Sequence, residues 1–520
     1  MTAAPYRSTE PVGRDGFTRL ARGEWTKFRT VRAWLVATGV AAVLVVGIGI
    51  LQGLGSHSTI DSTPDNPNGT AGHPYVPTGP DGEAVSDDFY FLHRPLAANG
   101  SLTTRVGTLS GGLISPHGGV PAGSGGPPVT GSVEPWAKAG LIIKTSTSQG
   151  TAYAAIMVTG GHGVRMQYNY TRDIAGPASA SWLRLTRAGD TITGYASTDG
   201  SIWTRVASVR LTGLPASAPA GMFVASPGHS TFDQHLGGGT GQGVLTSATA
   251  TFGAVDLRGG PAGSAWTGTG VGDQAPAAAG GYRQSGGGYT VTGSGDIAPD
   301  VGSSGATVER NLAGMFGALT VMVVLAVLFI TTEYRRGLIR TSLTTSPRRG
   351  RVLAAKALTI GAVTFVTGLV AAALAIPLGE HFLRRNGNYI YPVSALTEVR
   401  VVAGTAALLA VASVLALAVG TVLRRSAAAV AAVIVLVVLP YLLATAGVLP
   451  PGPADWLLRV TPAAAFAVQQ SLPAYPQVQH AYTPLLGFYP LAPWAGFAVL
   501  CGWTAVALVA AGYLLHRRDA

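Results

Sequence analysis

Charged residues are scarce in this chain: Asp, Glu, Lys and Arg make up 11% of its 520 residues, whereas hydrophobic residues make up 47%. With a mean hydropathy of +0.34, this composition is typical of a membrane protein. Cysteine is almost absent. Cys501 is the only one, so disulfides within one chain and Cys-rich metal sites are excluded.

Lysine is nearly as rare, and none of the four lysines follows a glycine. A phosphate-binding loop places its lysine directly after a glycine, so we do not expect this chain to hydrolyse ATP. Paired carboxylates of the kind that glycosidases use are also lacking, as is a calcium-binding spacing of acidic residues. We therefore expect no enzymatic activity, no cofactor and no metal site in this chain.

Six uncharged apolar runs are long enough to cross a bilayer, for which about 20 residues are needed. None contains Asp, Glu, Lys, Arg or His, which disfavours ion-coupled transport. The first run is too long for a cleaved signal peptide and is predicted to remain as an anchor. The predicted spans cover residues 33–54, 312–332, 357–378, 401–423, 427–448 and 493–515.

The net charge of +11 is distributed unevenly between the two sides of these spans. The segments assigned to the cytoplasm carry 18 Lys/Arg and 5 Asp/Glu, whereas the rest of the chain carries 17 Lys/Arg and 19 Asp/Glu. This is the positive-inside pattern, and it predicts that both termini are cytoplasmic. It also explains the basicity without nucleic-acid binding.

Residues 1–32 are predicted to be a cytoplasmic leader. Apolar residues recur in its second half at helical spacing, with basic residues between them. This pattern indicates an amphipathic helix on the inner leaflet, with Trp25 at the headgroup level. A disordered basic leader is the alternative.

Residues 55–311 have a different character, with short alternating strands and Gly-rich turns that predict an antiparallel β-sandwich. Its core is expected at 86–257, with an extra strand at 289–297. Residues 56–87 and 237–243 are rich in small residues and are predicted to be linkers, and residues 259–288 are a low-complexity stretch. The other expected strands are 101–109, 139–144, 152–158, 164–170, 182–187, 191–197, 202–209, 221–225 and 248–255.

Two tryptophans of this region, Trp136 and Trp266, are candidates for stacking on a carbohydrate ligand. The last outer segment, 449–492, contains several prolines and many aromatic residues. It is predicted to form short helices that dip into the membrane interface like a re-entrant segment. Aromatic-belt anchoring explains its rings equally well.

The loop between the second and third spans has the densest charge pattern. Residues 332–356, TEYRRGLIRTSLTTSPRRGRVLAAK, contain seven Lys/Arg between two uncharged runs. Such a loop is predicted to be cytoplasmic, and its pattern indicates a docking element. We define 333–356 as the coupling loop.

Three stretches resemble the permease subunits of ABC-2 type ATP-binding-cassette transporters. ARGEWTKFRTVRAW (21–34) is similar to the interface helix of that family, and WLLRVTPAAAF (456–466) is similar to the region before its last span. The coupling loop carries the most specific similarity. Within the insert, WAKAGLIIK and WLRLTRAGDTITGYASTDGSIWTRV resemble concanavalin-like jelly-roll domains of the laminin-G type.

The resemblance implies a fold and a set of partners. The fold is a polytopic α-helical membrane protein with six spans and an all-β jelly-roll sandwich inserted between spans 1 and 2; residues 312–520 form the five-span part. A separate ABC ATPase would dock on the coupling loop and on the interface helix, and a second permease chain would complete a homo- or heterodimer in the lipid bilayer. The implied ATPase-coupling residues are Glu333, Tyr334, Arg335, Gly337, Leu343, Pro347 and Arg348, and those of the interface helix are Phe17, Leu20, Glu24, Trp25 and Phe28.

The leading hypothesis is therefore a permease in a bacterial cell membrane, with the sandwich outside and cargo moving outward. In such jelly rolls a strand like 289–297 usually precedes one like 87–96, and here it follows, which suggests a permuted arrangement. The alternative function is a membrane-anchored binding or sensing protein that uses the sandwich to bind carbohydrate or cell-wall material.

Overall fold

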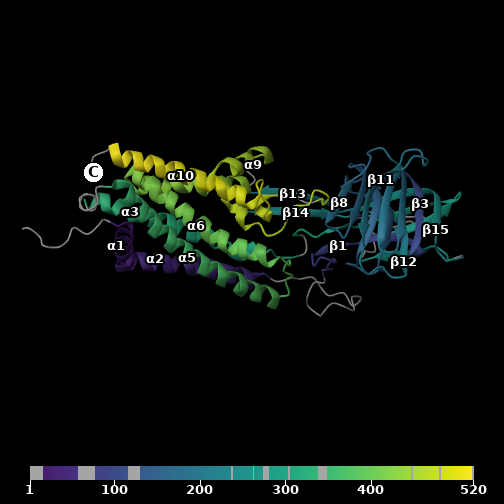
Figure 1. The fold of residues 1–520 in the computed structure, drawn as a ribbon, viewed down its shortest axis with the longest axis horizontal. Helices are drawn as coiled ribbons and strands as arrows, with labels where there is room; N and C mark the ends of the chain where they lie inside the picture. The colour runs from purple at the N-terminus through teal and green to yellow at the C-terminus, as the bar shows by residue number, and fades with distance from the viewer. Residues whose placement is uncertain are drawn as a thin grey trace, which may run out of the picture.

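The computed structural model describes residues 16–56, 76–114, 129–235, 238–261, 263–272, 280–302, 305–337, 348–446, 449–479 and 482–517. The molecule is elongated, with helices at one end and a β-sandwich at the other (Figure 1). Within the described residues, six helical segments are long and apolar enough to cross a membrane. They are α2 (Arg32–Gly55), α3 (Met315–Arg335), α5 (Arg349–Arg385), α6 (Ala395–Leu423), α7 with α8 (Ser426–Val437 and Leu439–Thr445) and α10 (Pro493–Arg517).

The six segments coincide with the predicted spans, but two differ in shape. Helix α5 begins eight residues before the predicted span and has 37 residues, so it takes in the end of the coupling loop. The fifth span is interrupted at Val438, and Pro440 lies in the first turn of α8. A proline has no N–H to donate to the preceding turn, which explains the break.

Glycines allow the membrane helices to approach closely. A Cβ atom at Gly49 of α2 would lie 2.5 Å from the carbonyl oxygen of Asn311, and one at Gly53 would lie 3.0 Å from Cβ of Phe382 on α5. Small residues at such contacts are typical of helix packing in membranes. Helix α2 is thereby held against both α5 and the short helix η2 (Val308–Leu312).

The predicted amphipathic helix is present as α1 (Phe17–Thr30). It ends at Val31, whose extended backbone separates it from α2. Helix α1 and the end of α10 both lie at the end of the helical part that is farthest from the sandwich (Figure 1). Residues 1–15 of the predicted leader and 57–75 of the predicted linker lie outside the described residues.

The sandwich consists of two antiparallel sheets. Strand β9 shows the expected alternation, with Leu183 and Leu185 buried in the core between the sheets. One sheet has the order β11 (Thr204–Arg210), β10 (Thr191–Ser197), β9 (Trp182–Ala188), β3 (Asn99–Ile114), β15 (Thr246–Arg258), β18 (Gly288–Gly293) and β17 (Gly281–Ser285), with β4 (Val129–Thr130) beside β3. The other has the order β16 (Thr267–Val271), β2 (Phe89–Ala97), β12 (Ser217–Ala225), β5 (Lys138–Lys144), β6 (Tyr153–Thr159), β7 (Val164–Tyr168) and β8 (Arg172–Ala175).

One predicted linker was assigned wrongly, and the low-complexity stretch also contains strands. Residues 237–243 contribute to β14 (Gly238–Val244), which forms a hairpin with β13 (His229–His235). Residues 259–288 contain β16 and β17. Glycine has a low strand propensity, but cross-strand hydrogen bonds need only the backbone, and these strands pair with stronger neighbours.

The two ends of the insert meet. Strand β1 (Val85–Asp87) pairs antiparallel with β19 (Ile297–Pro299), so Val85 lies opposite Pro299. The amide of Asp300 also donates to the carbonyl oxygen of Ala84 at 2.9 Å. The chain therefore enters and leaves the sandwich at one place.

The last outer segment packs against both parts of the molecule. It contains α9 (Pro451–Val460), η3 (Pro462–Gln469) and η4 (Pro484–Leu486). The side chain of Gln477 donates to the carbonyl oxygen of Thr171 in the sandwich at 3.2 Å, and Gln479 donates to Glu134. The sandwich thus contacts the outer ends of the helices beyond its two connections.

Candidate functional site

A cluster of four charged side chains joins α1 to the start of α5 and the end of α3. Lys356 lies at its centre with no exposed surface. Its ammonium group donates to Glu24 Oε2 at 2.7 Å and to Glu333 Oε1 at 2.7 Å. Both carboxylates are themselves buried, so the ion pairs are largely shielded from water.

Lys27 completes the cluster from the solvent side. It donates to Glu24 Oε1 at 2.8 Å and to Glu333 Oε1 at 3.3 Å. Burial lowers the pKa of Lys27, but the hydrogen bonds and negative charges of Glu24 and Glu333 outweigh this effect, and the pKa is raised overall. Two positive and two negative charges balance, as a buried site requires.

Aromatic rings form one wall of this charge cluster. The ammonium of Lys356 lies 4.9 Å from the ring centroid of Phe329, within cation–π range. Phe28, which is 1% exposed, packs edge-on against Phe329 at 6.1 Å between ring centroids and is stacked on Trp34 at 5.8 Å. The rings exclude water and anchor α1 on the membrane helices.

Local sequence explains how the charges meet. Glu24, Lys27 and Phe28 are spaced three and four residues apart, so they share one face of α1. Helix α3 continues past its apolar run to Arg335, which brings Glu333 into the helix, and the early start of α5 does the same for Lys356. Glu333 and Lys356, which the sequence places in the coupling loop, therefore lie in helices.

The predicted coupling residues divide into two groups. Glu333 is buried, and Tyr334 is half-buried with its ring 5.0 Å from the guanidinium of Arg424. Arg335, Gly337 and Arg348 are exposed. Leu343 and Pro347 lie outside the described residues.

The predicted residues of the interface helix divide in the same way. Glu24 and Phe28 face the membrane helices and are buried, whereas Phe17 and Trp25 are exposed and Leu20 is half-buried. The helix thus keeps an apolar strip on its outer side.

Sequence reasoning missed Lys27 and Lys356 as members of the site. Both were treated only as topology markers at span ends. A usable signal was present, since Lys356 stands between apolar residues on both sides in a chain with four lysines. A lysine in such surroundings needs a carboxylate partner.

The two tryptophans considered for ligand stacking lie apart on the sandwich. Trp136 is 7% exposed, and its ring is stacked on His162 at 4.0 Å. Trp266 is half-buried between Arg94 and Tyr289. Among the described residues no group of three or more His, Cys, Asp or Glu is arranged to hold a metal ion.

Comparisons with known proteins bear on the helical part. Residues 311–520 match the family model described as "ABC-2 family transporter protein". No curated protein matches the chain.

Two solved structures are similar to about two fifths of the chain. One is the crystal structure of a functionally unknown protein from Saccharomyces cerevisiae, with 15% identity and a TM-score of 0.20, covering 37% of this chain and 85% of that one. The other is SCP-B, a member of the Eqolisin family of peptidases, in a complex with a tripeptide, with 9% identity and a TM-score of 0.23, covering 40% of this chain and 98% of that one. At these TM-scores neither similarity carries an argument.

Proposed function

We propose that a separate ATPase drives this permease by docking on α1 and the coupling loop. The proposal follows from residues 311–520, which belong to the ABC-2 transporter family. The observation that carries the proposal is the buried contact of Lys356 with Glu24 and Glu333. It makes the interface helix and two membrane helices one mechanical unit.

The exposed residues of this unit provide the docking surface. Arg335 and Arg348 are exposed residues of the coupling loop, and Phe17 and Trp25 are exposed on α1. An ATPase that binds both α1 and the loop would move α3 and α5 together, since Glu333 and Lys356 are locked to α1. In this proposal the exposed residues bind the ATPase, and the buried residues transmit its movement to α3 and α5.

Topology and direction are part of the same proposal. Helix α1 has Lys27 and Arg29 in its last turn, and α10 ends with His516 and Arg517. Both lie at the same end of the helical part (Figure 1), which supports placing this end in the cytoplasm of a bacterial cell. The sandwich then lies outside. Uncharged membrane helices favour an apolar or amphipathic cargo, which we propose is exported by a unit of two permease chains and two ATPases.

The test is co-purification of the full-length chain with an ABC ATPase from the cells that produce it, followed by ATP turnover in the complex. Arg335→Glu with Arg348→Glu should abolish co-purification, because these substitutions reverse the charge of the docking surface. Glu333→Gln should leave the ATPase bound but lower transport-coupled ATP turnover by roughly tenfold or more, as expected for loss of a buried charged hydrogen bond.

Arg258→Glu is the matched control, because Arg258 is equally charged and exposed but lies on the sandwich. It should change neither measurement. If no ATPase co-purifies with the unchanged protein, or if Arg258→Glu is as harmful as the loop variant, the proposed function is wrong.

A further inference from the structure

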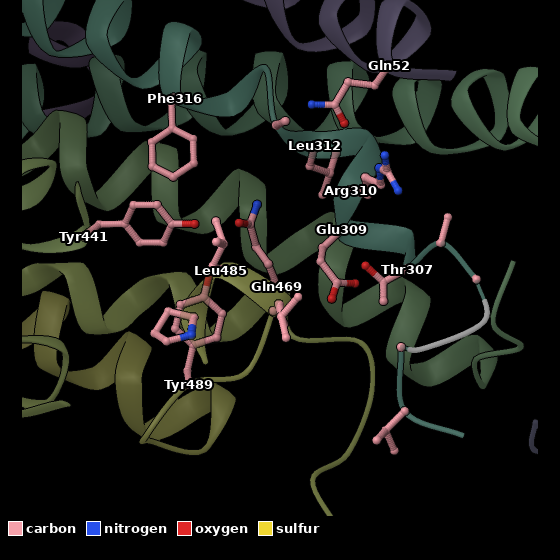
Figure 2. Close-up of a pocket in the computed structure, with 18 residues that line it drawn as sticks. Gln52, Thr307, Glu309, Arg310, Leu312, Phe316, Tyr441, Gln469, Leu485 and Tyr489 are labelled. Atoms are coloured by element: carbon pink, nitrogen blue, oxygen red, sulfur yellow. The ribbon is translucent and has the colours of Figure 1, made fainter. Parts of the chain in front are cut away.

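A cavity of about 430 Å³ lies at the sandwich-side ends of the membrane helices. It is enclosed by the segment that leads from β19 into α3, by α8, and by the last outer segment. Figure 2 shows Glu309 on one side of the cavity and the rings of Phe316 and Tyr441 on the opposite side, with Gln469 between them. A volume of this size is typical of sites for small organic ligands.

Two hydrogen-bond acceptors that line the cavity have no partner. Glu309 Oε2 and Gln52 Oε1 are both buried, and neither accepts a hydrogen bond from any described group. A buried acceptor without a donor costs free energy, and a carboxylate costs more than an amide. Glu309 Oε2 and Gln52 Oε1 can therefore each accept one further hydrogen bond, and a positively charged donor suits the carboxylate best.

The opposite wall is aromatic. The ring centroids of Phe316 and Tyr441 are 4.8 Å apart, and each lies 4.9 Å from the centroid of Phe466. These rings give an apolar surface, and their faces also attract cations. A ligand that suits both walls has a cationic head and an apolar body.

The nearby positive charges are engaged elsewhere or lie at the rim. Arg310 is exposed, and Arg400 donates to the carbonyl oxygen of Gln470 at 2.5 Å. The charges of Arg400 and Glu309 interact, but among the described residues neither guanidinium lies within ion-pair distance of Glu309, and Arg400 Nε is buried without a hydrogen-bond partner. Burial raises the pKa of the Glu309 carboxyl, and the hydrogen bonds that it receives from Ser471 and Thr307 offset this effect only in part.

We infer that this cavity binds amphipathic amines, with the ammonium group on Glu309 Oε2, the apolar body against Phe316 and Tyr441, and Gln52 Oε1 as a second acceptor. Such amines are the class of cargo that the site would present to the transporter. Only this last statement rests on the proposed function, because binding itself needs neither ATP nor an ATPase.

The experiment measures binding of naphthylethylamine to the full-length protein in detergent, by fluorescence, beside the neutral naphthylethanol. The unchanged protein should bind the amine more tightly than the alcohol by roughly ten- to a hundredfold, the range expected for a charged hydrogen bond. Glu309→Gln should remove this preference. Glu398→Gln should keep it, because Glu398 is an exposed carboxylate of the same end of the helices that lies outside the cavity.

Acidification of the unchanged protein provides a second readout that needs no variant. Protonation of Glu309 removes the charge, so the affinity for the amine should fall as the pH is lowered from about 8 to about 5, while the affinity for the alcohol stays constant. The other groups that face Glu309 do not titrate in this range: Arg310 and Arg400 stay charged, and burial raises the pKa of Tyr489 well above its ordinary value. Tyr441 is also a phenol, and its hydroxyl does not titrate between about pH 5 and pH 8.

Equal affinity for amine and alcohol, no binding of either, or a preference that survives Glu309→Gln would overturn the inference. If Glu309→Gln does not fold, the pH titration decides in its place. If an ATPase co-purifies with the protein but the amine test fails, the permease assignment stands and only the amine site is wrong.

Discussion

At the scale of single residues, the four lysines show how this chain treats charge. All four form ion pairs, and three of them, Lys138, Lys144 and Lys356, have no exposed side-chain surface. In the sandwich, Lys144 donates to Asp87 at 2.6 Å. A buried ion pair contributes little net stability, but removing one partner leaves an uncompensated charge. These lysines therefore specify which elements meet.

Lys356→Met should be strongly destabilising, because it leaves Glu24 and Glu333 buried beside each other. The expected loss is about 3–5 kcal/mol, measured as a lower apparent melting temperature of the full-length protein in detergent. Adding Glu24→Gln and Glu333→Gln should recover most of the loss, since the like charges are then gone.

The control for this prediction is Arg258→Met. The pair of Arg258 with Asp256 is exposed, at 78% and 50% of the side-chain surfaces, and exposed pairs are worth about 0–1 kcal/mol. A Lys356→Met protein that melts like this control would contradict the assigned role of the charge cluster.

The partners of Lys356 were beyond sequence reasoning for a physical reason. Glu24 is 332 residues away in the chain, and only the packing of α1 against α5 brings them together. Phe28 was predictable as an apolar residue of an amphipathic helix, but the ring that it faces, Phe329, was not. Periodicity shows which side of a helix is apolar and leaves its neighbour unspecified.

At the scale of elements, α10 is positioned by its contact with η3. A Cβ atom at Gly496 of α10 would lie 2.1 Å from the carbonyl oxygen of Ala464. That oxygen belongs to the backbone and cannot swing aside. The absence of a side chain at Gly496 is therefore what allows the two elements to touch.

Gly496→Ala should destabilise the helical part by about 1–3 kcal/mol, the usual cost of overpacking. Gly502→Ala on the same helix has nothing within 4 Å of the new atom, and it should be neutral or stabilise by about 0.5–1 kcal/mol, since alanine favours helix. Melting temperatures of the two variants should thus shift in opposite directions. Equal shifts would mean that the contact at Gly496 is not tight.

The positions of most elements were predictable, because membrane spans and alternating strands have strong patterns. Strand β10 coincides with the expected 191–197. The errors occurred where pairing, rather than side-chain pattern, decides the structure. Strand β16, TGTGV, carries little hydrophobic signal and is held by its register with β2.

At the scale of the whole molecule, the helices and the sandwich have separate cores. The main buried clusters of the helical part contain residues of α1 and of the membrane segments, whereas those of the sandwich contain residues from its strands. A small cluster where the two parts meet includes Val76, Ala84, Tyr391 and Leu472. The insertion was predictable from composition. Its contact with the last outer segment, through Gln477 and Gln479, was not predictable, because these residues are far in the sequence from their partners in the sandwich.

Replacing residues 86–298 by a short Gly-Ser bridge should leave the helical part folded. Val85 and Pro299 are partners in an antiparallel pair, so their Cα atoms are about 4.5–5.5 Å apart and a bridge of about two to four residues suffices. We expect a monodisperse protein by size-exclusion chromatography that still co-purifies with the ATPase. Aggregation of this variant would show that the helices need the sandwich to fold.

The pairing of β1 with β19 also has a mechanical meaning. The segments that lead to α2 and to α3 leave this antiparallel pair from the same end, at Val85 and Pro299. A force that spreads the outer ends of α2 and α3 would therefore load these hydrogen bonds one after another, as in a zipper, and not all at once, as in shear. The ribbon contains three residue pairs, so it has few hydrogen bonds with which to resist such a force, and we expect it to open before the longer ladders of the sandwich do.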